Sequence, residues 1–155
     1  MATWGEFAEQ APAMASLGHR IFANYGIGYL GTIRPDGGPR VHPISPVILE
    51  GRMYIGLMPQ TPKRKDLTND TRCVVHSLPG PNDSEICVRG TVQPISAEQV
   101  EELIHKAPTH VRIARDTNMY EIDIERVNCT VFENVGLDKR PSPTRTRWVA
   151  AQPKT

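Results

Sequence analysis

The chain has 155 residues, which is enough for one domain with a sizeable core and too few for two ordinary domains. Its 18 Lys and Arg residues against 17 Asp and Glu residues leave a formal net charge of +1, so bulk charge attracts neither nucleic acid nor an anionic membrane. No apolar run approaches the roughly 20 residues of a bilayer-spanning helix, and residues 1–10 lack the pattern of a signal peptide. We therefore expect a cytoplasmic protein that binds neither nucleic acid nor membrane.

Two short helices are predicted before the first strand. Thr3 can cap a helix that begins at Trp4, because Glu6 stands at the third helical position of a capping box. Pro12 suits the first turn of a second helix, which we expect to end near Asn24.

Strand-like segments separated by turn signals begin at Ile27. Turn sequences at 35–38 and 50–51 join the first three strands, so we expect these to form an antiparallel meander. A crossing helix is predicted after Thr61, and a capping box at Ser96 and Gln99 predicts another helix to about Lys106. Six antiparallel strands with peripheral helices and no βαβ alternation favour a mainly β fold built on a small barrel. The predicted strands cover 28–34, 39–49, 52–57, 72–78, 85–93 and 119–135, and the crossing helix covers 62–69.

The cysteines and histidines form no disulfide or metal pattern. Cys73, Cys87 and Cys129 are far apart, lack CxxC spacing and lie in apolar segments, so we interpret them as reduced, buried thiols. His105 and His110 stand five apart around a proline and cannot share a helix face, as zinc ligands often do. We therefore predict no metal site.

The segment around Pro43 and Pro46 is predicted to be an edge strand, a bulge or a cavity wall, because neither proline can donate a hydrogen bond to a neighbouring strand. Period-two geometry places Arg40, His42 and Ile44 on one face. An anion bound at Arg40 could then continue into a ligand that lies along His42 and Ile44. The alternative is an ordinary edge strand with a solvated Arg40.

A hydroxyl and three cations cluster at the predicted start of the crossing helix, in Thr61-Pro62-Lys63-Arg64-Lys65. Free amides and the positive end of the helix dipole favour a phosphate there, whereas the same dipole disfavours basic side chains in a first turn. Two interpretations stay open, a phosphate site and a solvated surface helix. The phosphate-loop patterns GxxxxGK[ST] and GxGxxG are both absent.

Three motifs stand in the order and at the spacing of a known family: YLGTIRPDGGPRVHP at 29–43, TxKxxDL at 61–67 and EICVRG at 85–90. Through them the chain resembles the pyridoxamine 5'-phosphate oxidase-like FMN-binding split barrels, which include related deazaflavin-dependent reductases. The likeness spans roughly 7–135. It implies a six-stranded antiparallel split β-barrel, a homodimer, and two equivalent cofactor sites built from both chains.

The resemblance also implies where the cofactor binds. Residues matching 40–45 line the flavin in that family and help to hold its phosphate, and the hydroxyl and lysine matching Thr61 and Lys63 bind the phosphate. The candidate cofactor-binding residues are therefore Arg40, Val41, His42, Pro43, Ile44, Ser45, Thr61, Pro62, Lys63, Glu85 and Trp148.

Glu85 and the C-terminal segment depart from the family pattern. Glu85 stands where the pyridoxamine oxidases have a flavin-contacting glutamine. Its negative charge would disfavour a reduced flavin anion, or its carboxylate would instead accept a hydrogen bond from a ring N–H. Trp148, beside Arg145 and Arg147, could stack on the flavin or the substrate, or belong to a disordered basic tail. The Arg-Leu-x-Pro signature of the oxidases is missing, so we do not expect true pyridoxamine phosphate oxidation.

The function expected from these features is that of a flavin-dependent oxidoreductase. It would hold FMN, or the deazaflavin coenzyme F(420), at a dimer interface and transfer a hydride to or from a small conjugated substrate. The cofactor supplies the chemistry, so the sequence names no catalytic residue. The alternative is a non-catalytic protein that binds or scavenges flavin or haem. We expect one FMN-binding domain over 1–135 and a basic tail over 136–155 that could cross to the partner subunit.

Overall fold

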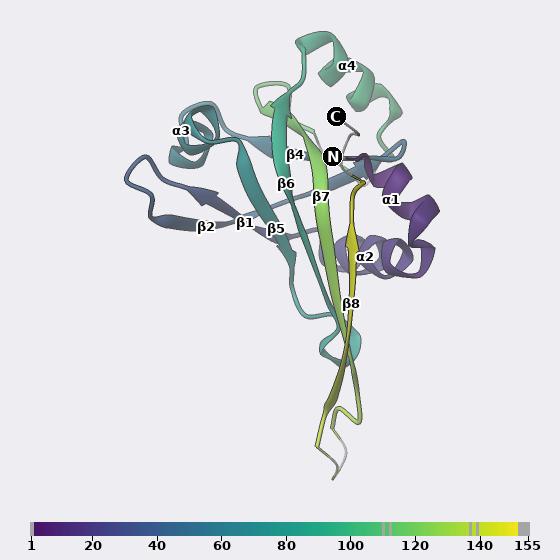
Figure 1. Cartoon of the computed structure of the whole chain (residues 1–155). Coiled ribbons are helices and arrows are strands. Elements are labelled where there is room, and N and C mark those ends of the chain that lie inside the picture. Colours follow the sequence, from purple (N-terminus) through teal and green to yellow (C-terminus); the bar gives the residue numbers. More distant parts are fainter. Residues whose placement is uncertain (1, 110, 112, 137, 139, 152–155) are drawn as a thin grey trace.

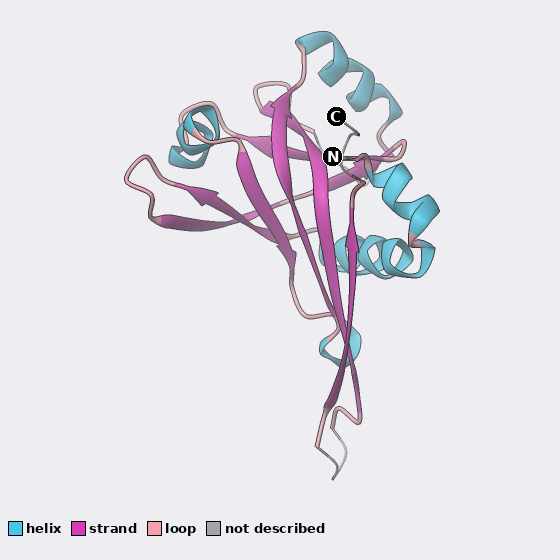
Figure 2. Ribbon diagram, in the orientation of Figure 1, coloured by secondary structure: helices cyan, strands magenta, loops and turns pink. Residues whose placement is uncertain are grey.

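The computed structural model describes residues 2–109, 111, 113–136, 138 and 140–151. Within these ranges the strands form one antiparallel sheet, and the helices lie around it (Figures 1 and 2). This confirms the mainly β fold class. The helices are α1 Trp4–Gln10, α2 Pro12–Tyr25, α3 Pro62–Asn69 and α4 Ala97–Lys106, with a 3₁₀ turn η1 at Pro81–Asp83. The strands are β1 Gly28–Ile33, β2 Pro39–Ile44, β3 Val47–Leu49, β4 Arg52–Leu57, β5 Arg72–Ser77, β6 Glu85–Pro94, β7 Asn118–Glu133 and β8 Ser142–Val149.

The predicted strand over 39–49 is two strands that pair with different neighbours. The sheet order is β2-β1-β5-β6-β7-β4-β3, so β2 pairs with β1, and β3 pairs with β4. Both antiparallel pairings of the predicted meander are therefore present, but its middle strand is divided, so that β4 pairs with β3 and β7 and not with β2. Only Ser45 and Pro46 separate β2 from β3, and Pro46 has no N–H to continue a ladder. Since β2 and β3, the first and last strands of the sheet order, are consecutive in the chain, the sheet curls back on itself.

The segment 142–149, which lies inside the predicted tail, forms the strand β8. It pairs with the second half of β7, from Arg126↔Val149 to Glu133↔Ser142. The first part of β7 pairs instead with β4, so this strand of 16 residues pairs with β6 along one edge and with β4 and then β8 along the other. The described chain thus has eight strand segments rather than six, because 39–49 is split and β8 is added.

The signals that predicted the helix starts are confirmed by the caps. Thr3 with Glu6 and Ser96 with Gln99 both form complete capping boxes. Proline stands at the start of α2 and of α3, as predicted. Thr61 occupies the cap position of α3, but its hydroxyl donates to the Met58 carbonyl at 2.9 Å instead of capping the helix.

One face of the sheet is packed, and part of the other is open. Helices α1 and α2 lie against one side of the sheet (Figure 2), and the core there contains Phe7 and Phe22 with Ile86 and Val88. A smaller apolar cluster joins α4 to β4 and β7. On the opposite face of β1 and β2, Tyr29 and Val41 remain 45% and 63% exposed. None of the described helices is long and apolar enough to cross a bilayer.

Candidate functional site

Asp66 joins helix α3 to strands β1 and β2. Thr32 and Arg40 are direct cross-strand partners, so their side chains lie on the same face of the sheet. The Asp66 carboxylate, only 2% exposed, accepts hydrogen bonds at Oδ2 from Thr32 Oγ1 at 2.8 Å and Arg40 Nε at 2.7 Å. Two donors compensate the cost of burying this charge. The start of α3 is thereby fixed next to Arg40.

Asp66 and Thr32 were not chosen as site residues from the sequence, although both carried a signal. Thr32 interrupts the inward-facing apolar positions of β1, and it is 4% exposed. Asp66 precedes the buried Leu67 and belongs to the TxKxxDL motif. A short polar side chain on an apolar face requires a partner, which each provides for the other.

The first turn of α3 carries uncompensated positive charge. It contains Lys63, Arg64 and Lys65 and no acidic residue. Arg64 Nη1 donates to the Pro59 carbonyl at 3.2 Å, and within the described ranges Lys63 and Lys65 form no ion pair. A helix N-terminus already bears partial positive charge, so these cations are placed against local preference. An anion such as a phosphate would relieve this repulsion.

Arg40 keeps donors available for such an anion. Its Nε atom binds Asp66, whereas its two Nη groups have no hydrogen-bond partner among the described residues. The side chain is 27% exposed, so solvent or a ligand can reach it. A guanidinium held at Nε and open at Nη can bind a phosphate without reorganising.

A cavity of about 1090 Å³ lies beside the start of α3. Its wall runs from Pro35, in the β1–β2 turn, to Gln60, Thr61 and Lys65. This volume is slightly above the usual range for small-molecule sites, so a ligand of nucleotide size has room at the helix start, although Arg40 and Lys63 do not line the cavity.

The candidate residues of β2 divide between two faces. Arg40 and His42 are half-buried and Ile44 is buried, which confirms the common face predicted for these three. Val41 and Pro43 are exposed on the opposite face, and Ser45 is exposed in the break before β3. As the terminal strand of the sheet, β2 also fulfils the expectation of an edge strand.

Glu85 lies at the other end of the sheet from the start of α3. Its Oε2 atom is 3.8 Å from His76 Nε2, and His76 stands next to Ser77, the last residue of β5. Helix α3 leads instead into Arg72, the first residue of β5. The two ends of β5, Arg72 and Ser77, are five residues apart, which corresponds to about 17 Å along a strand. Within one chain, the structure does not bring Glu85 together with Thr61 and Lys63.

Trp148 is a core residue and requires a correction to the predicted site. Its indole is 8% exposed, and its ring centroid lies 5.1 Å from that of Phe7. The Nε1–H group donates to Gln10 Oε1 at 3.1 Å. An aromatic ring enclosed in this way leaves no face on which a cofactor of the same chain could stack, so we remove Trp148 from the candidate site.

The three cysteines are free thiols of low reactivity. Cys73 and Cys129 are buried and Cys87 is half-buried. Burial raises the pKa of Cys73 to about 12 and that of Cys129 to about 11, and it also raises the pKa of Cys87. In the part of the chain that the structure describes, no group of three or more His, Cys, Asp or Glu side chains could hold a metal ion.

Comparison with known proteins identifies the fold. No protein-family model and no curated protein matches the sequence. Among solved structures, the chain is similar to a NimC/NimA family protein from Clostridium acetobutylicum, with a TM-score of 0.59 and 17% identity over 83% of this chain and 89% of that chain. An F420 reductase matches with a TM-score of 0.56 and 17% identity, over 71% of this chain and 94% of that chain.

A heme-binding protein from Mycobacterium smegmatis matches with a TM-score of 0.57 and 16% identity, over 81% of this chain. The match spans only 55% of that protein's length. Together these neighbours show that the chain has the split-barrel fold of the pyridoxamine 5'-phosphate oxidase-like proteins.

Proposed function

Because the chain has this split-barrel fold, we propose that it is a flavin-dependent oxidoreductase. It binds FMN or a deazaflavin and transfers a hydride to or from a small conjugated substrate. The observation that carries the proposal is the contact between Arg40 and Asp66, which holds a β2 cation beside the basic first turn of α3. Similarity to an F420 reductase supports the same class of function.

The residues at this place fit a cofactor phosphate. Lys63, a half-buried residue, supplies an ammonium group, and Arg40 supplies two open Nη groups. Thr61, at the cap position of α3, adds a hydroxyl, which leaves the Met58 carbonyl if it turns to donate to a phosphate oxygen. The neighbouring cavity of about 1090 Å³ has room for the ribityl chain beyond the phosphate. In this proposal Pro62 fixes the start of the helix and makes no polar contact.

The flavin ring would lie along the edge strand β2, towards Ser45. The bound flavin supplies the hydride chemistry, and the chain contributes phosphate binding, ring orientation and an open ring face. His42, half-buried on the face of Arg40, is positioned to donate a hydrogen bond to the ring. Glu85 begins β6, which is three strands away from β2 in the sheet, so in the proposal it comes from a partner subunit.

A homodimer completes the proposed site. Tyr29, Val41 and Met58 are between 45% and 63% exposed, and Tyr29 and Val41 lie on the face that carries no helix. Large exposed apolar side chains on an uncovered face of a sheet are typical of an interface. We propose that a second copy covers them in the cytoplasm, as the sequence led us to expect.

Binding without turnover is the second candidate. The likeness to a heme-binding protein from Mycobacterium smegmatis favours it, because that protein has the same fold. Haem would need an axial ligand, and His42 is the half-buried histidine nearest to Arg40 in the sequence.

A spectroscopic titration of the purified chain distinguishes these candidates. FMN, the deazaflavin and haem are added separately while their absorbance bands are recorded. Tight binding of FMN or the deazaflavin, with a band bleached by a reductant and restored by an acceptor, is the expected result. A Soret band after addition of haem, without binding of FMN or the deazaflavin, would contradict the oxidoreductase proposal and support the haem-binding alternative.

A further inference from the structure

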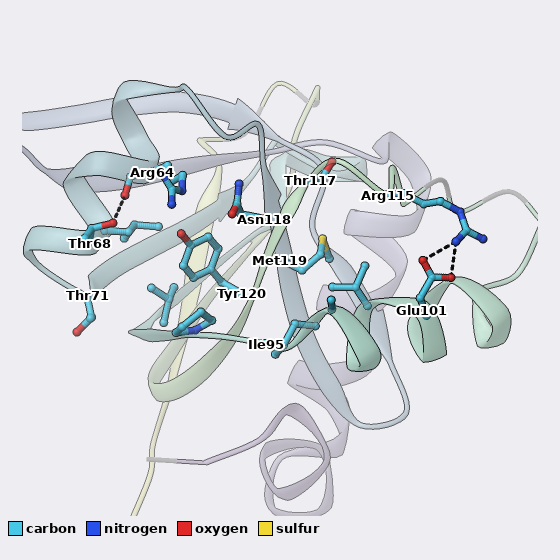
Figure 3. Close-up of a pocket in the computed structure, with 15 residues that line it drawn as sticks. Arg64, Thr68, Thr71, Ile95, Glu101, Arg115, Thr117, Asn118, Met119 and Tyr120 are labelled. Carbon is cyan, nitrogen blue, oxygen red and sulfur yellow. Dashed lines mark hydrogen bonds and ion pairs between the residues drawn. The ribbon is translucent and has the colours of Figure 1, made fainter.

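A second cavity lies beside α3 and does not include Arg40, Thr61 or Lys63. It has a volume of about 570 Å³, within the range of small-molecule sites, and is shown in Figure 3. Its walls come from α3, the end of β6, the start of α4 and the segment that leads into β7. From α3 it receives Arg64, Leu67 and Thr68, which share one helix face because they are three and four residues apart.

One end of this cavity combines a cation with two neutral polar groups. Figure 3 shows Arg64, Asn118 and Tyr120 at the same end. The guanidinium of Arg64 has no acidic partner in the described chain, since its one side-chain hydrogen bond goes to the Pro59 carbonyl. Tyr120 is 7% exposed, and neither its hydroxyl nor the Asn118 amide has a hydrogen-bond partner among the described residues. Such a group of donors suits a carboxylate.

A buried part of the remaining wall is apolar. Leu67, Val92 and Met119 are at most 4% exposed, and Val100 is 7% exposed. A ligand that reaches Arg64 therefore places the remainder of its surface against aliphatic and thioether groups, which favour an uncharged ring or short alkyl chain.

The other charged residues of the cavity neutralise each other. Arg115 Nη1 donates to both carboxylate oxygens of Glu101, at the end of the cavity away from Tyr120 in Figure 3. This pairing cancels the negative charge that would otherwise repel an anion. Arg64 is then the cation of the cavity with no acidic partner.

We propose that this cavity binds a small amphipathic monocarboxylate. Its carboxylate lies at Arg64, between the Asn118 amide and the Tyr120 hydroxyl, and its ring or alkyl body lies against Leu67, Val92 and Met119. The cavity shares Arg64 and Thr68 with the cavity of about 1090 Å³ at the start of α3, but Arg40, Thr61 and Lys63 do not line it, so the proposal does not rest on flavin binding.

Benzoate and its neutral counterpart benzyl alcohol test the proposal in a nuclear magnetic resonance titration of the ¹⁵N-labelled full chain. Benzoate should give saturable shifts at the amides of 64–71 and 117–120. Benzyl alcohol should bind at least about tenfold more weakly than benzoate, because it cannot accept charge-assisted hydrogen bonds. Arg64→Gln should weaken benzoate binding by about tenfold to a hundredfold and leave the affinity for benzyl alcohol nearly unchanged.

Two further variants give matched controls. Lys65→Gln removes the same charge one residue along α3, at a position that does not line the cavity, and should keep the affinity for benzoate. Ala97→Phe fills the cavity from an exposed position and should abolish binding with Arg64 intact. The absence of saturable shifts in the wild type, shifts centred on 40–45 instead, or equal losses in Arg64→Gln and Lys65→Gln would each overturn the proposal.

Discussion

Arg40 Nε and Asp66 Oδ2 lie 2.7 Å apart, although the two residues are 26 positions apart in the chain. The carboxylate also accepts a hydrogen bond from Thr32 and is almost completely buried. Strand β1, strand β2 and helix α3 therefore meet at one charged oxygen. The position of the phosphate-binding candidates depends on this contact.

Asp66→Asn should destabilise the fold by about 2 kcal/mol or more, because it leaves a partly buried guanidinium without its charged partner. Urea unfolding followed by fluorescence measures the change, and the m-value should stay constant. Asp36→Asn is the matched control, since Asp36 pairs with Arg34 on the surface. A loss no larger in Asp66→Asn than in this control would show that the buried contact is unimportant.

Trp148→Ala should cost about 3 to 5 kcal/mol of stability, the range found when a large aromatic side chain is removed from a core. Its indole packs on Phe7 and binds Gln10, so the folded variant should retain its affinity for FMN. Arg147→Ala, at the exposed neighbouring position, serves as the control in thermal unfolding. Unchanged stability together with lost affinity would place Trp148 at a cofactor after all.

Alkaline pH should destabilise the chain through its buried thiols. Burial raises the pKa of Cys73 to about 12, whereas the thiol of an unfolded chain ionises at about 8.5. The stability linked to this thiol is therefore fully present below about pH 8.5 and is lost as the pH rises towards 12. Unfolding in urea at a series of pH values above 8 should show a shallower decline in Cys73→Val than in the wild type. If the free energy of unfolding falls equally steeply with pH in both proteins, the raised pKa of the Cys73 thiol does not account for the loss of stability.

Val41→Arg should convert a homodimer into monomers without unfolding it, because Val41 is 63% exposed in the single chain. Sedimentation velocity measures the change, and circular dichroism checks the fold. Val131→Arg is a suitable control, since Val131 is also exposed but lies on β7, away from β1 and β2. A wild-type chain that is monomeric and still binds flavin fully would disprove the proposed interface.

Local chemistry allowed the helices to be predicted more accurately than the pairing of the strands. The Thr3 and Ser96 capping boxes and the proline at the start of α3 depend on residues within one turn, so the sequence was enough to locate them. The division of the predicted strand 39–49 at Pro46 was harder to predict, because whether a proline bends one strand or separates two depends on which neighbouring strands are present.

The candidate site shows the same limit. The shared face of Arg40, His42 and Ile44 followed from strand geometry alone. The burial of Trp148 did not, because its contact with Gln10 links residues 138 positions apart. The role of Asp66 was also missed, since an acidic residue in a basic helix is indistinguishable from a surface ion pair until its burial is known.

The affinity ratio between FMN and riboflavin tests the central claim most directly, because the two ligands differ only in the phosphate. We expect the wild-type chain to bind FMN at least about tenfold more tightly, the value of one charge-assisted hydrogen bond. Lys63→Gln should lower this ratio severalfold, since Arg40 and Thr61 remain to bind the phosphate, and Lys106→Gln, which removes a lysine from α4, should leave it unchanged. Equal wild-type affinities for FMN and riboflavin, or a ratio unaffected by Lys63→Gln, would contradict a phosphate site at the start of α3.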